Sequence, residues 1–164
     1  MINKFVFLPP QSDLFAEWIP RLLDSAPGWD IAAPETDAEA KLELGNADAA
    51  FGTMTPDLIA CAPNLRWLQA PAAAPDAGYY FDELIAHETK VTNFREIYND
   101  HISVQILTYI LSFTKHSHLY RDFQREREWH PLDAPHHEIF LPESTVLIIG
   151  IGGIGTETAR LCKA

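Results

Sequence analysis

Three glycines near the carboxyl end of the chain have the spacing of a turn that binds a dinucleotide. Gly150, Gly152 and Gly155 follow the apolar run 145–149 and precede a run typical of a helix. In a G-x-G-x-x-G turn between a strand and a helix, the missing side chains let the backbone approach a pyrophosphate at the amino end of the helix. The residues expected to contact the diphosphate of NAD or NADP are Gly150, Gly152, Gly153, Ile154 and Gly155.

The same glycines are also compatible with two other kinds of turn. A phosphate-binding loop of the G-x-x-x-x-G-K-[ST] kind shares the spacing of Gly150 and Gly155, but Thr156 and Glu157 stand where its lysine and hydroxyl residue would follow. A plain glycine-rich turn is the other alternative. The apolar run before the glycines and the helical pattern after them favour the dinucleotide turn.

Composition limits the class of protein and its partners. The chain has 164 residues, of which 47% are hydrophobic and 21% charged, and its net charge is -11. Such a negative charge argues against nucleic acid and anionic membranes as partners, because both attract basic surfaces. The apolar runs are too short for a signal peptide or a membrane span. Cys61 and Cys162 lie in helix-like segments, which a reduced cytoplasmic protein explains more simply than a disulfide does.

Histidines concentrate in the segment after Trp129. His130, His136 and His137 are near Asp133 and Glu138, and these side chains could ligate zinc. Solvated loop residues are the favoured interpretation, because the segment has no regular ligand spacing. We therefore expect no metal site.

The first part of the chain alternates between strand-like and helix-like segments. The expected strands are 5–8, 30–33, 49–51, 66–70 and 90–94. The connections between them have the length of helices, which predicts right-handed crossovers and a doubly wound parallel sheet. Residues 1–97 are therefore expected to form one α/β domain.

The next segment has the pattern of one long helix. No glycine or proline interrupts the chain from Asn99 or Asp100 to Trp129. Its first half is apolar on more than one face, which indicates burial between two bodies. We expect residues 98–143 to form a long interdomain helix followed by an arm, and residues 144–164 to begin a second, truncated domain with a strand and a helix.

Four segments together give the chain a resemblance to a known family. They are LRWLQAP at 65–71, VTNFREIYND at 91–100, REREW at 125–129 and VLIIGIGGIG at 146–155. In this order and spacing the chain resembles the D-isomer-specific 2-hydroxyacid dehydrogenases. The resemblance implies a flavodoxin-like substrate domain and the first β-α element of a Rossmann domain. It also implies hydride transfer between NAD or NADP and a small 2-hydroxy or 2-oxo acid.

The resemblance assigns substrate contacts but no catalytic residue to this chain. In the family, the catalytic arginine, acid and histidine follow the glycine-rich turn, so they would lie beyond Ala164. In the family, the backbone of the loop after the fourth strand holds the substrate carboxylate, and a side chain shortly before the long helix often points into the cleft. The corresponding residues here are Ala73, Ala74, Asp76 and Tyr98.

The chain departs from the family pattern near both substrate segments. Ala74 stands where glycine is usual, and Pro75 has no N–H to donate. Glu96 also replaces a usual glycine. Val104 and Gln105 replace an acidic residue and a histidine. These departures are compatible with a different substrate preference or with a non-catalytic binding or dimerising module derived from the family.

The final apolar run predicts an additional partner. The first strand of a Rossmann domain is central, and residues 146–149 have no successor strand in this chain. A second copy could cover them, so we expect a homodimer through residues 100–155. We also expect the chain alone to be inactive and to bind NADH weakly or not at all, because the turn lacks walls for adenosine and nicotinamide.

Overall fold

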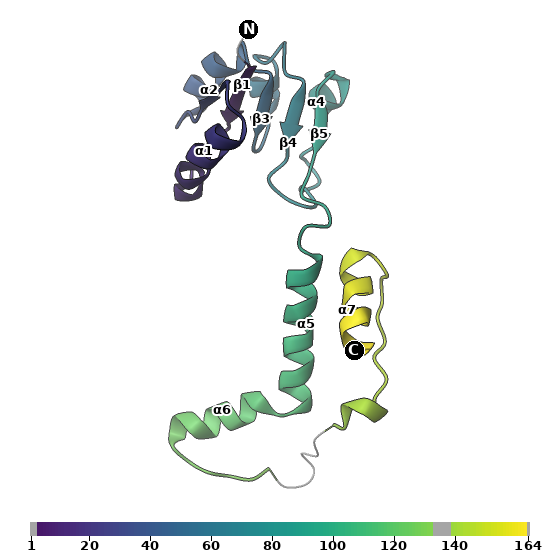
Figure 1. Cartoon of the computed structure of the whole chain (residues 1–164). Coiled ribbons are helices and arrows are strands. Elements are labelled where there is room, and N and C mark those ends of the chain that lie inside the picture. Colours follow the sequence, from purple (N-terminus) through teal and green to yellow (C-terminus); the bar gives the residue numbers. More distant parts are fainter. Residues whose placement is uncertain (1–2, 133–138, 164) are drawn as a thin grey trace. The chain divides into compact units, whose positions relative to one another are not determined.

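The computed structural model describes residues 3–132 and 139–163, which form two compact units. The first unit is Met1–Arg95 and the second is Glu96–Ala164. Figure 1 shows strands and helices in the first unit, whereas the described part of the second unit contains helices and no strand. Each unit is described by itself below.

The first unit is built on a five-stranded sheet in which every pair of neighbouring strands is parallel. Its strands are β1 (Asn3–Phe7), β2 (Trp29–Ala32), β3 (Ala49–Phe51), β4 (Trp67–Gln69) and β5 (Lys90–Thr92). The strand order is β2-β1-β3-β4-β5, which is the order of flavodoxin-like doubly wound sheets. The structure therefore confirms the expected fold class, with strand ends that differ by one or two residues.

One face of this sheet is covered by three short helices. They are α2 (Asp37–Leu44), α3 (Pro56–Ile59) and α4 (Asp82–Ala86). Successive strand residues point to opposite faces, so Val6 of β1 and Leu68 of β4 pack with Leu44, Leu58 and Leu84 of these helices. All five side chains are buried. This cluster is the main core of the unit.

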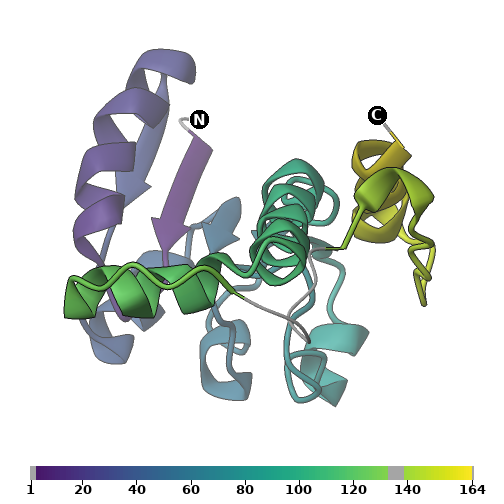
Figure 2. The same ribbon diagram turned by 90° about the horizontal axis from the view of Figure 1, so that it is seen from below.

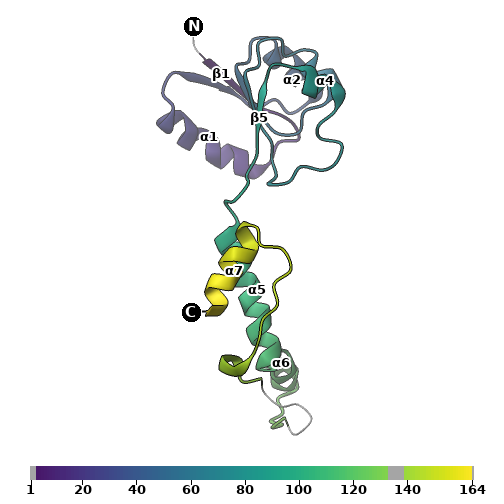
Figure 3. The ribbon, with the colours of Figure 1, turned by 90° about the vertical axis from the view of Figure 1, so that its right-hand side faces the viewer.

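The opposite face carries an aromatic layer beneath α1 (Asp13–Ser25). The ring of Phe15 in α1 stacks on Phe7 at 4.9 Å and meets Phe51 edge-on at 5.4 Å. Figure 3 shows α1 on one side of the sheet and α2 and α4 on the other. Helices on both faces make the sheet doubly wound, as its strand order requires.

Local sequence explains where two of these helices begin. The side chain of Thr36 accepts a hydrogen bond from the N–H of Glu39, whose carboxylate accepts one from the N–H of Thr36. This capping box satisfies two donors that the first turn of α2 leaves free. Thr55 caps α3 in the same way through the N–H of Leu58, and Pro56 occupies the first helical position, where no N–H is needed.

The expected long helix of the second unit is two helices. α5 spans Asn99–Thr114 and α6 spans Ser117–Glu126. The break lies at His116, whose φ of 53° is left-handed. Its carbonyl already accepts the N–H groups of Leu119 and Tyr120, which begins a new helix in another direction. The prediction of one helix was wrong because it relied on the absence of glycine and proline, and a histidine supplies the left-handed residue. Figure 2 shows α6 turning away from α5.

The end of the chain forms a helix but not the expected strand. After the short 3-10 helix η1 (Leu141–Glu143), residues 145–149 form no strand, and α7 spans Gly153–Lys163. A strand requires a neighbour to share hydrogen bonds, and none of the described residues pairs with this segment. Leu147 is 83% exposed and Ile149 is 93% exposed. Figures 1 and 3 show α7 beside α5, with both helices starting at the same end.

No helix in the described part of the chain combines the length and the apolar character that crossing a membrane requires.

Candidate functional site

The glycine turn places two of its glycines where a side chain would be costly. Gly150 has φ of 98°, which residues with a Cβ rarely adopt. A Cβ on Gly155 would strike the carbonyl oxygen of Gly150 and would also lie 3.3 Å from Cγ2 of Ile148. Gly150 therefore forms the tight turn, and Gly155 lets α7 start directly against the preceding segment.

The middle glycine differs from these two. A Cβ on Gly152 would meet no heavy atom within 4 Å, so packing does not require a glycine there. An open position between two constrained glycines is what close approach of a pyrophosphate requires. The three glycines thus have the three separate properties of a dinucleotide turn.

The amino end of α7 supplies hydrogen-bond donors at this turn. The N–H of Thr156 donates to the carbonyl of Gly152 at 2.9 Å. The N–H groups of Gly153, Ile154 and Gly155 precede that first bond of the helix, so they have no carbonyl within it. No acidic residue occupies the first turn of α7. The partial positive charge of the helix end can therefore be satisfied by an anion.

One small polar residue is buried in each of the neighbouring helices α5 and α7. Ser103 of α5 and Thr158 of α7 are buried, and each hydroxyl donates to a carbonyl of its own helix. Farther along α7, the guanidinium of Arg160 donates to Glu157 and lowers the pKa of that carboxyl. Glu157 is thus paired within its own helix, one turn away from the donors of the glycine turn.

The loop after β4 borders a pocket in the first unit. The pocket has a volume of about 270 Å³ and lies where β3 and β4 end. Ligands of open α/β sheets bind at the carboxyl ends of the strands. Its lining residues are Thr53, Met54, Pro71, Ala72, Ala74, Pro75, Asp76, Gly78 and Tyr79.

The sequence-predicted substrate residues are only partly brought together. Ala74 and Asp76 line the pocket, whereas Ala73 is adjacent in the loop but outside the lining. Tyr98 belongs to the second unit, where it precedes α5. Glu96, at a position where the resemblance implies glycine, has a left-handed φ of 73°. The backbone thus keeps a conformation that favours glycine although the residue has changed.

Free backbone donors and one buried tyrosine characterise this loop. Among the described residues, none accepts a hydrogen bond from the N–H of Ala73 or Ala74. The hydroxyl of Tyr79 donates to the carbonyl of Gly52 at 3.0 Å, and burial raises the pKa of Tyr79 to about 12. The neutral phenol ties the loop to the end of β3, and the free N–H groups could hold a carboxylate.

Sequence reasoning missed Thr53, Met54 and Tyr79 as pocket residues. The first two follow β3 directly, so the rule that parallel strands present their carboxyl ends at one edge could have identified them. Tyr79 carried no comparable signal, because its role depends on how the loop folds back.

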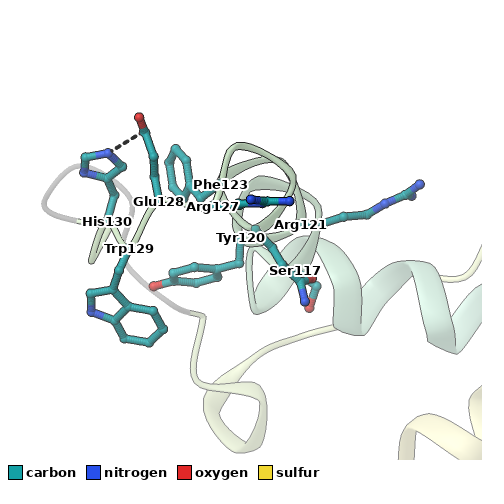
Figure 4. A pocket seen from close by; sticks show the side chains of 9 residues that line it. Ser117, Tyr120, Arg121, Phe123, Arg127, Glu128, Trp129 and His130 are labelled. Carbon is teal, nitrogen blue, oxygen red and sulfur yellow. Dashed lines mark hydrogen bonds and ion pairs between the residues drawn. The ribbon is translucent and has the colours of Figure 1, made fainter.

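A second pocket lies at the end of α6 and has a volume of about 640 Å³. Tyr120 and Phe123 extend from the helix, while Trp129 and His130 extend from the segment that follows it (Figure 4). The ring Nε2 of His130 lies 2.8 Å from a carboxylate oxygen of Glu128. The pocket is aromatic and open, and its residues lie within the segment expected to form a dimer interface.

Most of the side chains that were weighed as zinc ligands lie outside the described residues. Asp133, His136, His137 and Glu138 are not among the described residues. Within 3–132 and 139–163, no three His, Cys, Asp or Glu side chains are grouped as metal ligands.

Comparison with known proteins finds a family model that matches most of the second unit. Residues 107–164 match the model of the D-isomer specific 2-hydroxyacid dehydrogenase, NAD binding domain. Among curated proteins, no sequence matches the chain.

Solved structures resemble nearly the whole chain. A D-isomer specific 2-hydroxyacid dehydrogenase family protein from Aeromonas salmonicida is 26% identical, with a TM-score of 0.76 over 99% of this chain and 51% of its own. A D-lactate dehydrogenase from Treponema pallidum is 24% identical, with a TM-score of 0.77 over 98% and 50%. A D-lactate dehydrogenase from Aquifex aeolicus, solved with NAD and lactic acid, is 18% identical, with a TM-score of 0.67 over 98% and 48%. The last two comparisons concern the fold alone.

The chain therefore spans about half the length of these solved proteins. The sequence match covers the glycine turn and α7, and the structural match extends through the sheet of the first unit. Together they show that the chain is similar to the D-isomer-specific 2-hydroxyacid dehydrogenases.

Proposed function

We propose that this chain forms the substrate-binding part and the start of the cofactor-binding part of an NAD(P)-dependent oxidoreductase. The reaction would be oxidation of the CH–OH group of a D-2-hydroxy acid, or reduction of the 2-oxo acid in reverse. The nicotinamide would supply or accept the hydride. The observation that carries the proposal is the glycine turn, in which Gly150 and Gly155 are constrained and Gly152 is open.

The cofactor's diphosphate would bind at the amino end of α7. Gly153, Ile154 and Gly155 offer three N–H donors. Each hydrogen bond to the bound anion contributes about 1.5–3 kcal/mol to the binding free energy. The association itself costs about 4–15 kcal/mol, because the cofactor loses translational and rotational freedom. With no walls for the adenosine or nicotinamide, the dissociation constant should be about 1 mM or weaker for this chain alone.

The substrate's carboxylate would bind to the loop after β4. The N–H groups of Ala73 and Ala74 are the donors, and Pro75 removes the next one in the chain. Asp76, an acid beside this pocket, would disfavour a substrate with a second negative group nearby. A compact monocarboxylate is therefore the preferred substrate class. Tyr98 remains a proposed cleft residue.

The catalytic arginine, acid and histidine implied by the family would come from sequence that follows residue 164. Reading the coding sequence past this position tests that part of the proposal. We expect an in-frame continuation that contains all three residues. A continuation without them would instead favour a non-catalytic binding module.

Cofactor binding is tested directly with NADH. Transfer of tryptophan fluorescence to NADH should show weak, saturable binding by the wild-type chain and none by Gly152→Ala, whose new methyl group enters the open position. Equal binding by the two proteins would contradict the assigned turn. Micromolar affinity for NADH would contradict the expectation that this chain alone provides no walls for the adenosine and the nicotinamide.

We further propose that a second copy covers the exposed apolar segment before the turn. Leu147 and Ile149 are almost fully exposed, and each would gain about 1.5–3 kcal/mol from burial. Light scattering should therefore show a dimer formed through residues 100–155. The double change Leu147→Glu and Ile149→Glu should give a monomer, whereas Leu42→Glu should not. Leu42 is 82% exposed on α2, outside the proposed interface.

A monomeric wild-type chain with residues 145–149 still ordered would contradict the dimer.

The free thiols Cys61 and Cys162 fit the proposed cytoplasmic location, where cysteines stay reduced.

A further inference from the structure

A third pocket lies at the amino ends of two neighbouring strands of the first unit. Arg66 directly precedes β4, and Lys90 is the first residue of β5. The N–H of Lys90 donates to the carbonyl of Arg66 at 3.0 Å, so both residues stand at the same edge of the sheet. The pocket has a volume of about 820 Å³, and its lining comes from the turn before β4 and from the segment that joins α4 to β5 (Figure 1). It is at the edge of the sheet opposite to the pocket bordered by the loop after β4.

Positive charge is concentrated in this pocket although the unit has few basic residues. Two of its six lysine and arginine residues line the pocket, namely Arg66 and Lys90. The six are Lys4, Arg21, Lys41, Arg66, Lys90 and Arg95. The ammonium of Lys90 makes no ion pair with any described residue. A cation left without a carboxylate in a concave site attracts anions from solution.

The guanidinium of Arg66 is held by one of its nitrogens and keeps its other donors. Its Nη2 donates to a carboxylate oxygen of Asp48 at 2.9 Å, and the second oxygen of Asp48 accepts the N–H of Lys4 at 2.9 Å. Asp48 is thus fixed to the sheet and in turn orients the guanidinium. Within the described residues, Nε and Nη1 of Arg66 make no hydrogen bond. A planar guanidinium with donors to spare matches the oxygen spacing of a phosphate group.

Further N–H donors border the same pocket. None of the described residues accepts a hydrogen bond from the N–H of Asn64 or Glu88, and both residues line the pocket. The Nδ1 of His87 accepts the N–H of Thr89 at 3.1 Å, so the neutral ring has its proton on Nε2, where it can donate. Glu88 is the one acid among the lining residues, and its side chain is exposed. Donors therefore outnumber the negative groups at this site.

We propose that this pocket binds the phosphate group of a small aliphatic molecule. The guanidinium of Arg66 would hold two phosphate oxygens, Lys90 would supply a second positive charge, and the N–H groups of Asn64 and Glu88 would complete the contacts. The lining residues include no Phe, Tyr or Trp on which a nucleobase could stack, which favours an aliphatic phosphate ester over a nucleotide. The proposal does not depend on the glycine turn or on the nicotinamide cofactor.

The test uses the 15N-labelled chain titrated with inorganic phosphate at constant ionic strength, so that general screening does not change. The backbone amide signals of Asn64 and Glu88 should shift saturably, with one common dissociation constant. Acetate under the same conditions should not reproduce these shifts. Glycerol 3-phosphate should bind at least as tightly as inorganic phosphate, and AMP should bind no more tightly than glycerol 3-phosphate.

Charge variants in matched pairs locate the site. Lys90→Gln should weaken phosphate binding by about 3- to 10-fold, whereas Arg21→Gln, an equal loss of charge on α1, should not. Glu88→Gln removes a repelling carboxylate and should tighten binding by about 2- to 5-fold, whereas Glu17→Gln on α1 should leave it unchanged. Opposite effects of the two pocket variants are not expected from a loss of folding.

A further variant tests the geometry of the guanidinium. Arg66→Lys keeps a positive charge beside Asp48 but loses the planar fork, and it should weaken phosphate binding by about 3- to 10-fold. Thermal melting of this variant should match that of the wild type, which separates the loss of binding from a loss of stability.

Three results would overturn the proposal. Phosphate could leave the amides of Asn64 and Glu88 unshifted, or acetate could shift them equally, and in either case the pocket is not a phosphate site. Equal binding by Lys90→Gln and Arg21→Gln would refute the assigned contacts. Tighter binding of AMP than of glycerol 3-phosphate would refute the aliphatic ligand class.

Discussion

Replacing Gly155 with alanine should damage the fold, whereas the same change at Gly152 should not. At 155 the new methyl group would overlap the carbonyl oxygen of Gly150 and lie 3.2 Å from its carbonyl carbon. Overpacking against backbone costs about 1–3 kcal/mol. At 152 the methyl group meets nothing within 4 Å. There, the reduced freedom of the unfolded chain should stabilise the protein by about 0.4–1 kcal/mol.

These free energies convert into measurable shifts. For a chain of this length, 1 kcal/mol changes the melting temperature by about 2–4 °C. Thermal unfolding followed by circular dichroism should thus show Gly155→Ala lowered by about 2–12 °C and Gly152→Ala unchanged or slightly raised. Hydrogen exchange of α7 should accelerate only in Gly155→Ala. Equal destabilisation by the two changes would refute the division of roles among the glycines.

Three further changes test other parts of the structure. Tyr79→Phe should cost about 1–3 kcal/mol in urea unfolding, because the buried carbonyl of Gly52 loses its donor. Because the pKa of Tyr79 is raised to about 12 in the folded protein, the hydroxyl stabilises the fold fully below pH 10, and this stabilisation is lost between about pH 10 and 12. The difference in unfolding free energy between wild type and Tyr79→Phe should therefore shrink over that range. An unchanged difference would contradict this. Thr36→Ala should lower stability by about 0.5–2 kcal/mol through loss of the α2 cap, and thermal melting would show it. Pro75→Ala adds an N–H to the loop, and NMR titration with a 2-oxo acid should show binding tightened by up to about 10-fold, whereas no change would mean that the loop backbone does not hold the carboxylate.

The sheet could be predicted from the sequence because its signals are local. Strands and helices alternate with short connections, and Thr36 and Thr55 mark two helix starts by their side-chain chemistry. Parallel pairing follows from the helix-length crossovers, whereas the flavodoxin-like sheet was implied by the family resemblance. The glycine turn was also recognisable, since its spacing reflects backbone requirements within six residues.

The second unit was predicted less completely because its structure depends on distant contacts. The helix breaks at His116, which has a left-handed backbone conformation. No residue pattern in α5 predicts that conformation. The apolar run 145–149 has the pattern of a strand but lacks a strand to pair with. The contact of Asn99 with Gly153 joins positions 54 residues apart, and the sequence alone does not place them together.

We propose that the amino end of α7 and its glycine turn receive the diphosphate of a nicotinamide cofactor. The most direct measurement is an NMR titration of the 15N-labelled chain with NADH, in which the backbone amide of every residue is followed. We predict saturable shifts at Gly150–Thr156 with a dissociation constant of about 1 mM or weaker, and their loss in Gly152→Ala. Shifts that are absent from these residues, or that survive unchanged in Gly152→Ala, would contradict the claim.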